Sequence, residues 1–239
     1  MFSYQDLLNQ LKIAYAHPGG KATTKQWIQQ IHFDQMKHIL EIGCGTGQTL
    51  KQLRDHTEAF LYGIDQSNEM VQIAKKETLQ MPLIEIMQQR IEELLFMHDF
   101  FDLIVSESVL AFTPISENLE FLTDLLKPDG QIVLVEMVKS DQLRPEEEEE
   151  IKSFYQLPQL FSKQEWLLQF EKQSLDVITA DQLTKISHTP PALPSSISDE
   201  AIDTLFHHYQ LNDKYNDFLH TYLFIVGKRG IGRDYSPYY

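Results

Sequence analysis

The sequence has little cysteine, few basic residues and no long apolar run. Its 239 residues include one cysteine, Cys44, which cannot form an intrachain disulfide or the thiol-rich spacing of a structural zinc site. The 20 Lys and Arg are outnumbered by 35 Asp and Glu, and the formal net charge is −15. No apolar run approaches the ~18 residues of a membrane-spanning helix. The first and third absences argue against a secreted disulfide scaffold and a membrane span, and they favour the cytoplasm. A nucleic-acid partner is also disfavoured, because contacts with phosphates require clustered Lys and Arg.

From residue 38 onward, short apolar runs alternate with helical patterns. Such alternation predicts right-handed crossovers that build a parallel sheet covered on both faces. We therefore expect an α/β fold: a doubly wound, Rossmann-like, mostly parallel seven-stranded sheet with helices on both faces and an inserted helical cap. The predicted strands are His38–Ile42, Phe60–Ile64, Leu83–Met87, Phe101–Ser106, Gln131–Met137, Leu175–Ala180 and Tyr222–Lys228. The predicted helices between the first five strands are Thr49–Arg54, Asn68–Glu77 and Ser116–Leu126.

The segments outside this alternation are expected to surround the sheet. Ser3 is a suitable cap for a first helix, and Thr23 or Thr24 for a second. The stretch between the last two strands far exceeds a hairpin loop of ~2–5 residues, so it needs structure of its own, with a helix from about Ser198. We interpret this insert as a cap that covers a site; the alternative is that it only protects the edge of the sheet. The expected organisation is N-terminal helices covering the site (1–37), the core (38–180 and 222–229), the inserted cap (181–221) and a flexible tail (230–239).

A glycine loop follows the first predicted strand, in the segment ILEIGCGTGQTL. Gly43, Gly45 and Gly47 have the spacing G-x-G-x-G, whereas the dinucleotide fingerprint is G-x-G-x-x-G. The next strand ends at Asp65, where a carboxylate can accept hydrogen bonds from the two adjacent hydroxyls of a ribose. A solvated loop aspartate or a helix cap is the plain alternative for Asp65. Loop and acid together predict a nucleoside site.

Four motifs occur along the chain: EIGCGTG at residues 41–47, DQSNEM at 65–70, FDLIVS at 101–106 and LKPDG at 126–130. In this order they resemble the motifs of the class I S-adenosylmethionine-dependent methyltransferases. The resemblance is close over about residues 15 to 140. The segment His17–Gly20 together with Thr24 is also similar to small-molecule members related to the quinone-biosynthesis methyltransferases.

The resemblance implies S-adenosylmethionine as the cofactor and gives roles to residues of these motifs. The glycine loop would form the floor beneath the methionine moiety, Glu41 would orient the loop or the amino group, and Asp65 would hold the ribose hydroxyls. Gln66 and Met70 would flank the adenine. Ser106 and Glu107 would line the methionine end near the transferable methyl. The implied cofactor-binding residues are Glu41, Gly43, Cys44, Gly45, Gly47, Asp65, Gln66, Met70, Arg90, Ile91 and Ser106.

The stretch after the third predicted strand departs from the family pattern. Arg90 stands where the family usually places an acid that accepts from the adenine amino group, and arginine has no acceptor. Either Gln89 or Glu92 supplies the acceptor, or stacking and backbone groups hold the adenine.

Methyl transfer is an in-line displacement that depends mainly on alignment and needs no metal, and we expect no metal site. Phenol or amine acceptors must also lose a proton to a base. Candidate catalytic residues are His17, Glu107 and His188, of which we prefer the first two. The alternatives are a surface or capping role for the histidines and a cofactor-holding role for Glu107.

Two further features have ordinary explanations. The acidic run 146–150 follows Pro145, and proline at the first helical position with acids in the first turn is typical of a helix start. Phe154, Tyr155, Phe161 and Trp166 indicate packing of helices onto the sheet rather than an acceptor pocket.

The function that these patterns favour is methyl transfer from S-adenosylmethionine to a small, neutral or cationic organic acceptor. The alternative is an S-adenosylmethionine-binding protein without catalysis, acting as a regulatory or partner subunit. A nicotinamide-dependent oxidoreductase is disfavoured by the early third glycine. The acceptor and the oligomeric state are not determined by the sequence.

Overall fold

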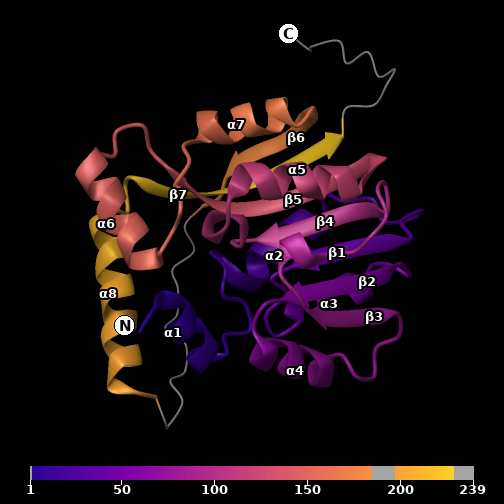
Figure 1. Cartoon of the computed structure of the whole chain (residues 1–239), viewed down its shortest axis with the longest axis horizontal. Helices are drawn as coiled ribbons and strands as arrows, with labels where there is room; N and C mark the ends of the chain where they lie inside the picture. The colour runs from indigo at the N-terminus through magenta and orange to yellow at the C-terminus, as the bar shows by residue number, and fades with distance from the viewer. Residues whose placement is uncertain (1, 185–196, 229–239) are drawn as a thin grey trace.

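The computed structural model describes residues 2–184 and 197–228, which form one seven-stranded sheet with helices around it (Figure 1). The strand order is β3-β2-β1-β4-β5-β7-β6. The strands are β1 His38–Ile42, β2 Phe60–Asp65, β3 Ile84–Gln88, β4 Phe101–Glu107, β5 Leu126–Lys139, β6 Leu175–Gln182 and β7 Leu219–Lys228. The helices are α1 Tyr4–Leu11, α2 Gly20–Ile28, α3 Gln48–Arg54, α4 Asn68–Glu77, α5 Ile115–Leu125, α6 Pro145–Tyr155, α7 Lys163–Lys172 and α8 Asp199–Lys214, with short 3-10 turns η1 Ile91–Glu93 and η2 Leu110–Phe112.

The sheet is parallel from β1 to β5, and β7 alone runs antiparallel to its neighbours β5 and β6. Because β1 pairs with β2 on one side and β4 on the other, the chain winds outward from β1 in both directions. The prediction of a doubly wound, mostly parallel sheet is therefore confirmed.

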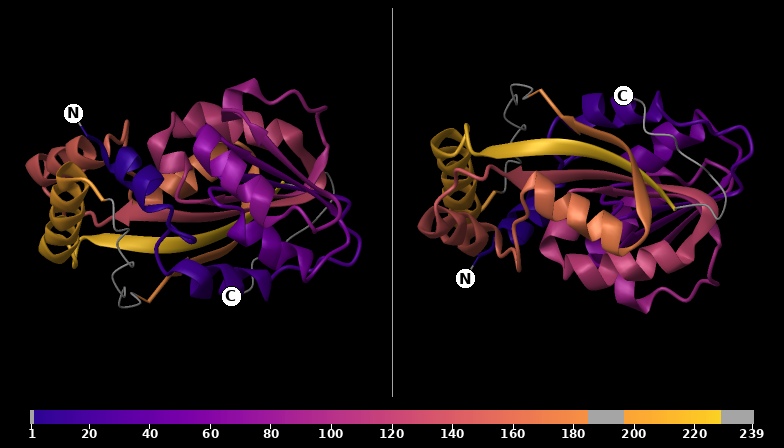
Figure 2. Two further views of the ribbon diagram at one scale, coloured as in Figure 1. Left: turned by 90° about the horizontal axis from the view of Figure 1, so that it is seen from below. Right: turned by 90° about the horizontal axis from the view of Figure 1, so that it is seen from above.

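Two hydrophobic cores lie on opposite faces of the sheet (Figure 2). On one face α2, α3 and α4 pack against the sheet, with Trp27 of α2 fully buried. On the other face α5 and α7 pack, with Trp166 of α7 fully buried. Alternate strand residues enter opposite cores, as Ile132 and Val133 of β5 do. Burial on both faces explains why the strands read as continuous apolar runs.

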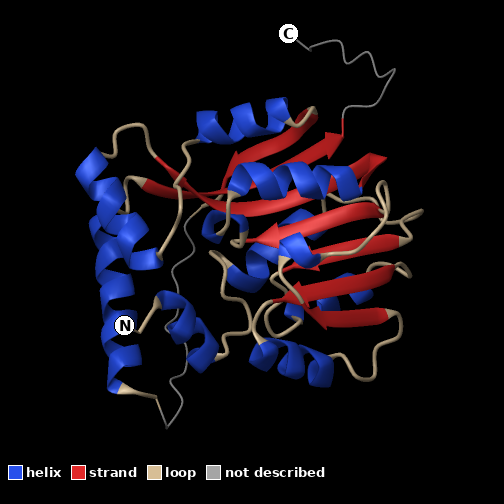
Figure 3. Cartoon of the chain, viewed as in Figure 1, coloured by secondary structure: helices blue, strands red, loops and turns tan. Residues whose placement is uncertain are grey.

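The helices α1, α6 and α8 gather beyond the carboxyl ends of the parallel strands (Figures 1 and 3). Tyr155 of α6 and Leu211 of α8 share a third hydrophobic cluster, and Leu7 of α1 shares a fourth with Ala201 of α8. The sequence signals for two of these helices hold, since Ser3 forms a capping box with Asp6 and the Ser198 hydroxyl accepts from the Ala201 amide. Helices far apart in the sequence, α1 and α8, thus lie together at the carboxyl ends of the parallel strands.

Several predicted boundaries differ from the structure. The second helix begins at Gly20 after Gly19, so Thr23 and Thr24 lie inside it and the prediction that either is its cap is wrong. Strand β5 begins at Leu126 rather than Gln131, because the predicted turn residues form a bulge within the strand opposite β4. Strands β6 and β7 extend further than predicted, which shortens the insert to residues 183–218. The tail 230–239 and His188 lie outside the described residues.

The acidic run 146–150 is the start of α6, as predicted, with Pro145 at the first helical position and acids in the first turn. The run is explained by local structure, since four of its acids form ion pairs within the chain: Glu147 with Arg144, Glu148 with Lys139, Glu149 with Lys152 and Glu150 with Lys214.

Candidate active site

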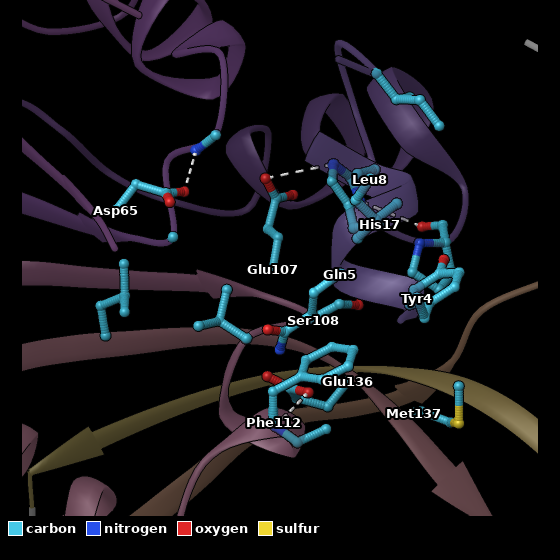
Figure 4. Close-up of a pocket in the computed structure, with 18 of the residues that line it drawn as sticks. Tyr4, Gln5, Leu8, His17, Asp65, Glu107, Ser108, Phe112, Glu136 and Met137 are labelled. Atoms are coloured by element: carbon cyan, nitrogen blue, oxygen red, sulfur yellow. Dashed lines mark hydrogen bonds and ion pairs between the residues drawn. The ribbon is translucent and has the colours of Figure 1, made fainter. Parts of the chain in front are cut away.

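A cavity of about 1680 Å³ opens at the carboxyl ends of the parallel strands. It extends from the glycine loop and the end of β2 to residues of α1, α6 and α8 (Figure 4). Asp65 lies on one side of Glu107 in this view, and Tyr4 and Met137 lie on the other. A single ligand pocket is typically ~300–1,000 Å³, so this cavity has room for two molecules side by side.

The glycine loop is held against both neighbouring strands. The Cys44 amide donates to the Ile64 carbonyl at 2.9 Å. A Cβ on Gly43 would lie 2.4 Å from Cγ2 of Val109, so only glycine fits where the loop passes the segment after β4. A Cβ on Gly45 would meet no atom within 4 Å. Gly45 therefore presents an open surface to the cavity.

Asp65 faces the cavity at the end of β2 with capacity to accept further hydrogen bonds. Its Oδ2 accepts from the Gly45 amide at 3.0 Å and its Oδ1 from the Ser67 amide at 2.8 Å. Burial raises the pKa of Asp65, and these two amides oppose that rise. A carboxylate has about four acceptor positions, so each oxygen retains one for a ligand hydroxyl.

Glu41 and Thr46 bring unpartnered polar atoms to the cavity wall. Oε2 of Glu41 and Oγ1 of Thr46 are buried, and neither has a hydrogen-bond partner among the described residues. Burial and the nearby Glu107 raise the pKa of Glu41 well above its ordinary value. A ligand that carries a cationic donor would satisfy this carboxylate and reverse the effect on its pKa.

Glu107 joins the N-terminal segment to the sheet. Its Oε1 accepts from the Thr24 hydroxyl and from Nε1 of Trp27, each at 2.9 Å. Its Oε2 accepts from the Thr49 hydroxyl at 2.7 Å and lies 3.4 Å from Nε2 of His17. These donors come from the segment before β1 and from α3. One buried carboxylate therefore joins the segment before β1, α3 and the end of β4 around the cavity.

His17 is brought next to Glu107, as expected for two residues of one site, but both of its ring nitrogens face protein oxygens. Nε2 lies 3.2 Å from the Thr24 hydroxyl as well as near Glu107, and Nδ1 lies 3.3 Å from the Pro18 carbonyl. This geometry favours a positioning role for His17 over proton abstraction.

The expected adenine end is formed by the residues after β2 and β3. Gln66, Met70, Arg90 and Ile91 all line the cavity, as do Gln89 and Glu92. The Arg90 guanidinium is directed to Glu92, with Nε 2.6 Å from Oε1.

Two of the predicted cofactor-binding residues do not line the cavity. Gly47 is the N-cap of α3 and packs against Ala74 of α4. Ser106 is fully buried and its hydroxyl donates to Glu136 at 3.4 Å. Cys44 does line the cavity, but its thiol packs on Gly63 and burial raises the thiol pKa well above its ordinary value.

Sequence reasoning missed several residues of the site. Thr24 was considered as a helix cap and as part of the similarity around His17–Gly20, Trp27 was not singled out as a site residue, and Thr49 lies on the first turn of α3. Tyr155, interpreted as a packing residue, lines the cavity. Glu136 lines it too, accepts from the Leu110 amide at 3.0 Å, and has its pKa raised by burial to about 8. An acid inside an apolar strand pattern was the available signal for Glu136.

The open side of Gly45, the remaining acceptor positions of Asp65 and the unpartnered Glu41 oxygen occur together along one wall. This donor and acceptor set fits a ribonucleoside that carries a cationic amino group. In the described part of the chain, no group of three potential metal-ligating side chains is arranged to hold an ion.

Comparisons with known proteins give the family. The model of a family described as "Methyltransferase domain" matches residues 33–174, more than half of the chain. The chain is also 31% identical over 234 residues to a protein of Bacillus subtilis (strain 168) named "Uncharacterized methyltransferase YodH", covering 95% of this chain and 100% of that protein. The chain belongs to the class I S-adenosylmethionine-dependent methyltransferases, and S-adenosylmethionine is its cofactor.

Solved structures share the fold at low sequence identity. The Haemonchus contortus phosphoethanolamine N-methyltransferase 2, in complex with S-adenosyl-L-methionine, is similar with a TM-score of 0.77 at 17% identity. That similarity covers 94% of this chain and 57% of the other. The cyclase SpnF is similar with a TM-score of 0.72 at 16% identity, covering 95% of this chain and 93% of the other. One fold thus occurs in proteins named for different reactions.

Proposed function

We propose that this methyltransferase transfers a methyl group from S-adenosylmethionine to a small organic acceptor by in-line displacement. The observation that carries the proposal is one continuous cavity in which Asp65, the open face of Gly45 and the unpartnered Glu41 oxygen adjoin further space lined by α1, α6 and α8. When bound, the cofactor supplies a methyl carbon activated by a sulfonium charge.

In this proposal each wall of the cavity holds one part of the cofactor. Asp65 accepts from the ribose hydroxyls, and Glu41 accepts from the cationic amino group. Gly43, Cys44 and Gly45 form the floor through their backbone. Around the adenine we place Gln66, Met70, Arg90 and Ile91, with Gln89 or Glu92 as the acceptor for its amino group.

Glu107 and His17 lie where the methionine end and the acceptor would meet. Glu107 holds Thr24 and His17 in place, which keeps the N-terminal segment closed over the cavity. His17 removes a proton from the acceptor only if Nδ1 leaves the Pro18 carbonyl. A His17→Gln variant separates the two roles: a positioning residue lowers turnover at every pH, whereas a base changes the shape of the pH profile.

We further propose that segments 1–37 and 181–221 act as a cover over the acceptor end of the cavity. Tyr4 and Leu8 of α1 and Tyr209 of α8 line that end. None of the described helices is both long and apolar enough to cross a membrane. A cytoplasmic location is proposed on the buried, unpaired Cys44.

Calorimetric titration with S-adenosylhomocysteine tests the cofactor site. We expect the wild type to bind, and Asp65→Ala to weaken binding at least tenfold because two buried hydrogen bonds to the ribose are lost. Asp55→Ala, on an exposed residue that does not line the cavity, is the matched control. Tight binding of NAD, or unchanged affinity in Asp65→Ala, would contradict the assignment.

A turnover screen then separates an enzyme from a non-catalytic binder. Methyl-labelled S-adenosylmethionine is offered with phenols, thiols, amines and quinols, and transfer to one of these classes is the expected result. Cofactor binding without transfer to any acceptor class would favour the alternative of a regulatory or partner subunit.

A further inference from the structure

The part of the cavity beyond Glu107 has its own walls, which we name the acceptor lobe. It is lined by side chains of α1, of the segment after β4, of α6 and of α8. Figure 4 shows Tyr4 across Glu107 from Asp65, and Phe112 below Glu107. The residues that define the lobe are Tyr4, Leu8, Phe112, Tyr155, His208 and Tyr209.

The aromatic residues of the acceptor lobe form a connected cluster. Tyr4 packs edge-on against Tyr155, with ring centroids 4.8 Å apart and planes at 88°. Tyr4 also stacks on His208 at 5.1 Å. These rings come from three different helices and give the lobe an aromatic wall, which suits an aromatic or other apolar guest.

Polar groups in the lobe are neutral hydrogen-bonding groups. The Tyr155 hydroxyl lies 2.9 Å from Nδ1 of His208, and Asn212 Nδ2 donates to that hydroxyl at 3.3 Å. Burial raises the pKa of Tyr155 above its ordinary value and that of Tyr4 to about 12, so both phenols stay uncharged. They can recognise a hydroxyl or an amine of a guest.

The charge of the whole cavity is one-sided. Among the described residues that line it, six are Asp or Glu and one is Lys or Arg. That residue, Arg90, lies at the opposite end and is paired with Glu92. A phosphate or carboxylate on the acceptor would therefore find no guanidinium or ammonium among the described residues of the lobe, whereas the Glu107 carboxylate borders it. A cationic guest would instead meet tyrosine faces.

We propose that the acceptor lobe selects an aromatic or similarly apolar acceptor that carries a hydroxyl or an amine and has no negative charge. The selection comes from the tyrosine walls and from the absence of Lys and Arg among the described residues of the lobe. This inference rests on the proposed function, because it concerns the partner of the same methyl transfer.

Binding of three phenols that differ only in charge tests the proposal. Tyramine, para-ethylphenol and para-hydroxyphenylacetate are titrated into the protein saturated with S-adenosylhomocysteine, at pH 8 and low salt. We expect the cationic and neutral phenols to bind at least tenfold more tightly than the anionic one. Equal or tighter binding of the anion, or no binding of either other phenol, overturns the proposal.

A variant with an added positive charge provides a second test. Asn212→Arg places a cation on the lobe wall and keeps a donor for the Tyr155 hydroxyl, whereas Gln210→Arg adds the same charge to an exposed position of α8 outside the cavity wall. We expect Asn212→Arg to bind the anionic phenol at least tenfold more tightly than the wild type and to weaken tyramine binding, with neither change in Gln210→Arg. The same response in both variants overturns the proposal.

The titration with S-adenosylhomocysteine alone distinguishes failure of the proposed function from failure of the inference about the acceptor. Absence of that binding removes the proposed function itself. Binding of S-adenosylhomocysteine together with preference for the anionic phenol removes only the inference about the acceptor.

Discussion

At the scale of single residues, the side chain with the most connections in the site is Glu107. It accepts from two threonine hydroxyls and an indole and contacts His17, and all of these lie in the buried or half-buried interior. A carboxylate so fully occupied is a weak candidate for a base. Its consequence is structural: Glu107 adds buried hydrogen bonds that hold the N-terminal segment at the carboxyl ends of the parallel strands.

Glu107→Ala should therefore destabilise the protein. The change leaves the buried Nε1 of Trp27 without its acceptor and frees the Thr24 and Thr49 hydroxyls, and each buried unsatisfied group costs about 1–3 kcal/mol. We expect the free energy of unfolding, measured by urea denaturation, to fall by about 3 kcal/mol. Glu92→Ala removes an exposed carboxylate from the same cavity and should change it by less than about 0.5 kcal/mol. Equal losses in the two variants would contradict this role.

At the scale of elements, two glycines at the junction of β1 and α3 have different roles. Gly43 allows the segment after β4 to approach, and Gly45 leaves room in the cavity. Both have positive φ, at 63° and 50°, so both would suffer similar backbone strain on substitution by alanine. They differ in what the new methyl group would meet.

Alanine at each glycine should consequently have a different effect. Gly43→Ala drives a methyl group into Val109, and we expect a loss of about 2–4 kcal/mol in the free energy of unfolding. Gly45→Ala should cost only about 1 kcal/mol of stability from backbone strain, but should weaken S-adenosylhomocysteine at least tenfold by filling the space for the cofactor. Urea denaturation and calorimetry measure the two effects. A reversed pattern would show that Gly45, not Gly43, is the close-packed position.

At the scale of the whole molecule, the negative charge is distributed unevenly between surface and interior. Surface acids such as the run 146–150 are paired or solvated, whereas Glu41 and Glu136 are buried and both have raised pKa values because of desolvation. In the proposed function, the cationic amino group of the cofactor compensates Glu41. Glu136 remains beneath the η2 turn, where it accepts from the Leu110 and Ala111 amides.

The buried acid Glu136 makes stability depend on pH. Its pKa is about 8 in the folded protein and about 4.5 when unfolded, so between these values the folded state binds the proton more strongly. The free energy of unfolding should therefore fall as pH rises from about 4.5 to 8, by at most about 5 kcal/mol from this group. Glu136→Gln keeps an acceptor for the Leu110 amide and cannot titrate. Urea denaturation at pH 5, 6.5 and 8.5 should show a smaller decrease in Glu136→Gln than in the wild type; parallel decreases would contradict it.

The sequence by itself determined the order of strands and helices, the glycine loop and the acid at the end of β2. These features depend on local patterns: apolar periodicity, chain breakers, and residues at strand ends. The conformations of Lys127–Gly130 and of the start of α2 were not predicted correctly, because bulges and glycine-led helix starts are set by pairing with distant segments.

Only the tertiary structure decided how the site is completed. The contacts of Glu107 with Thr24 and Trp27 join residues more than 79 positions apart, and Tyr155 meets His208 from a different helix 53 positions away. No local period reports such contacts, because they arise when α1, α6 and α8 pack over the edge of the sheet. The cofactor end of the cavity could thus be predicted from motifs, whereas the walls of the acceptor lobe follow from packing.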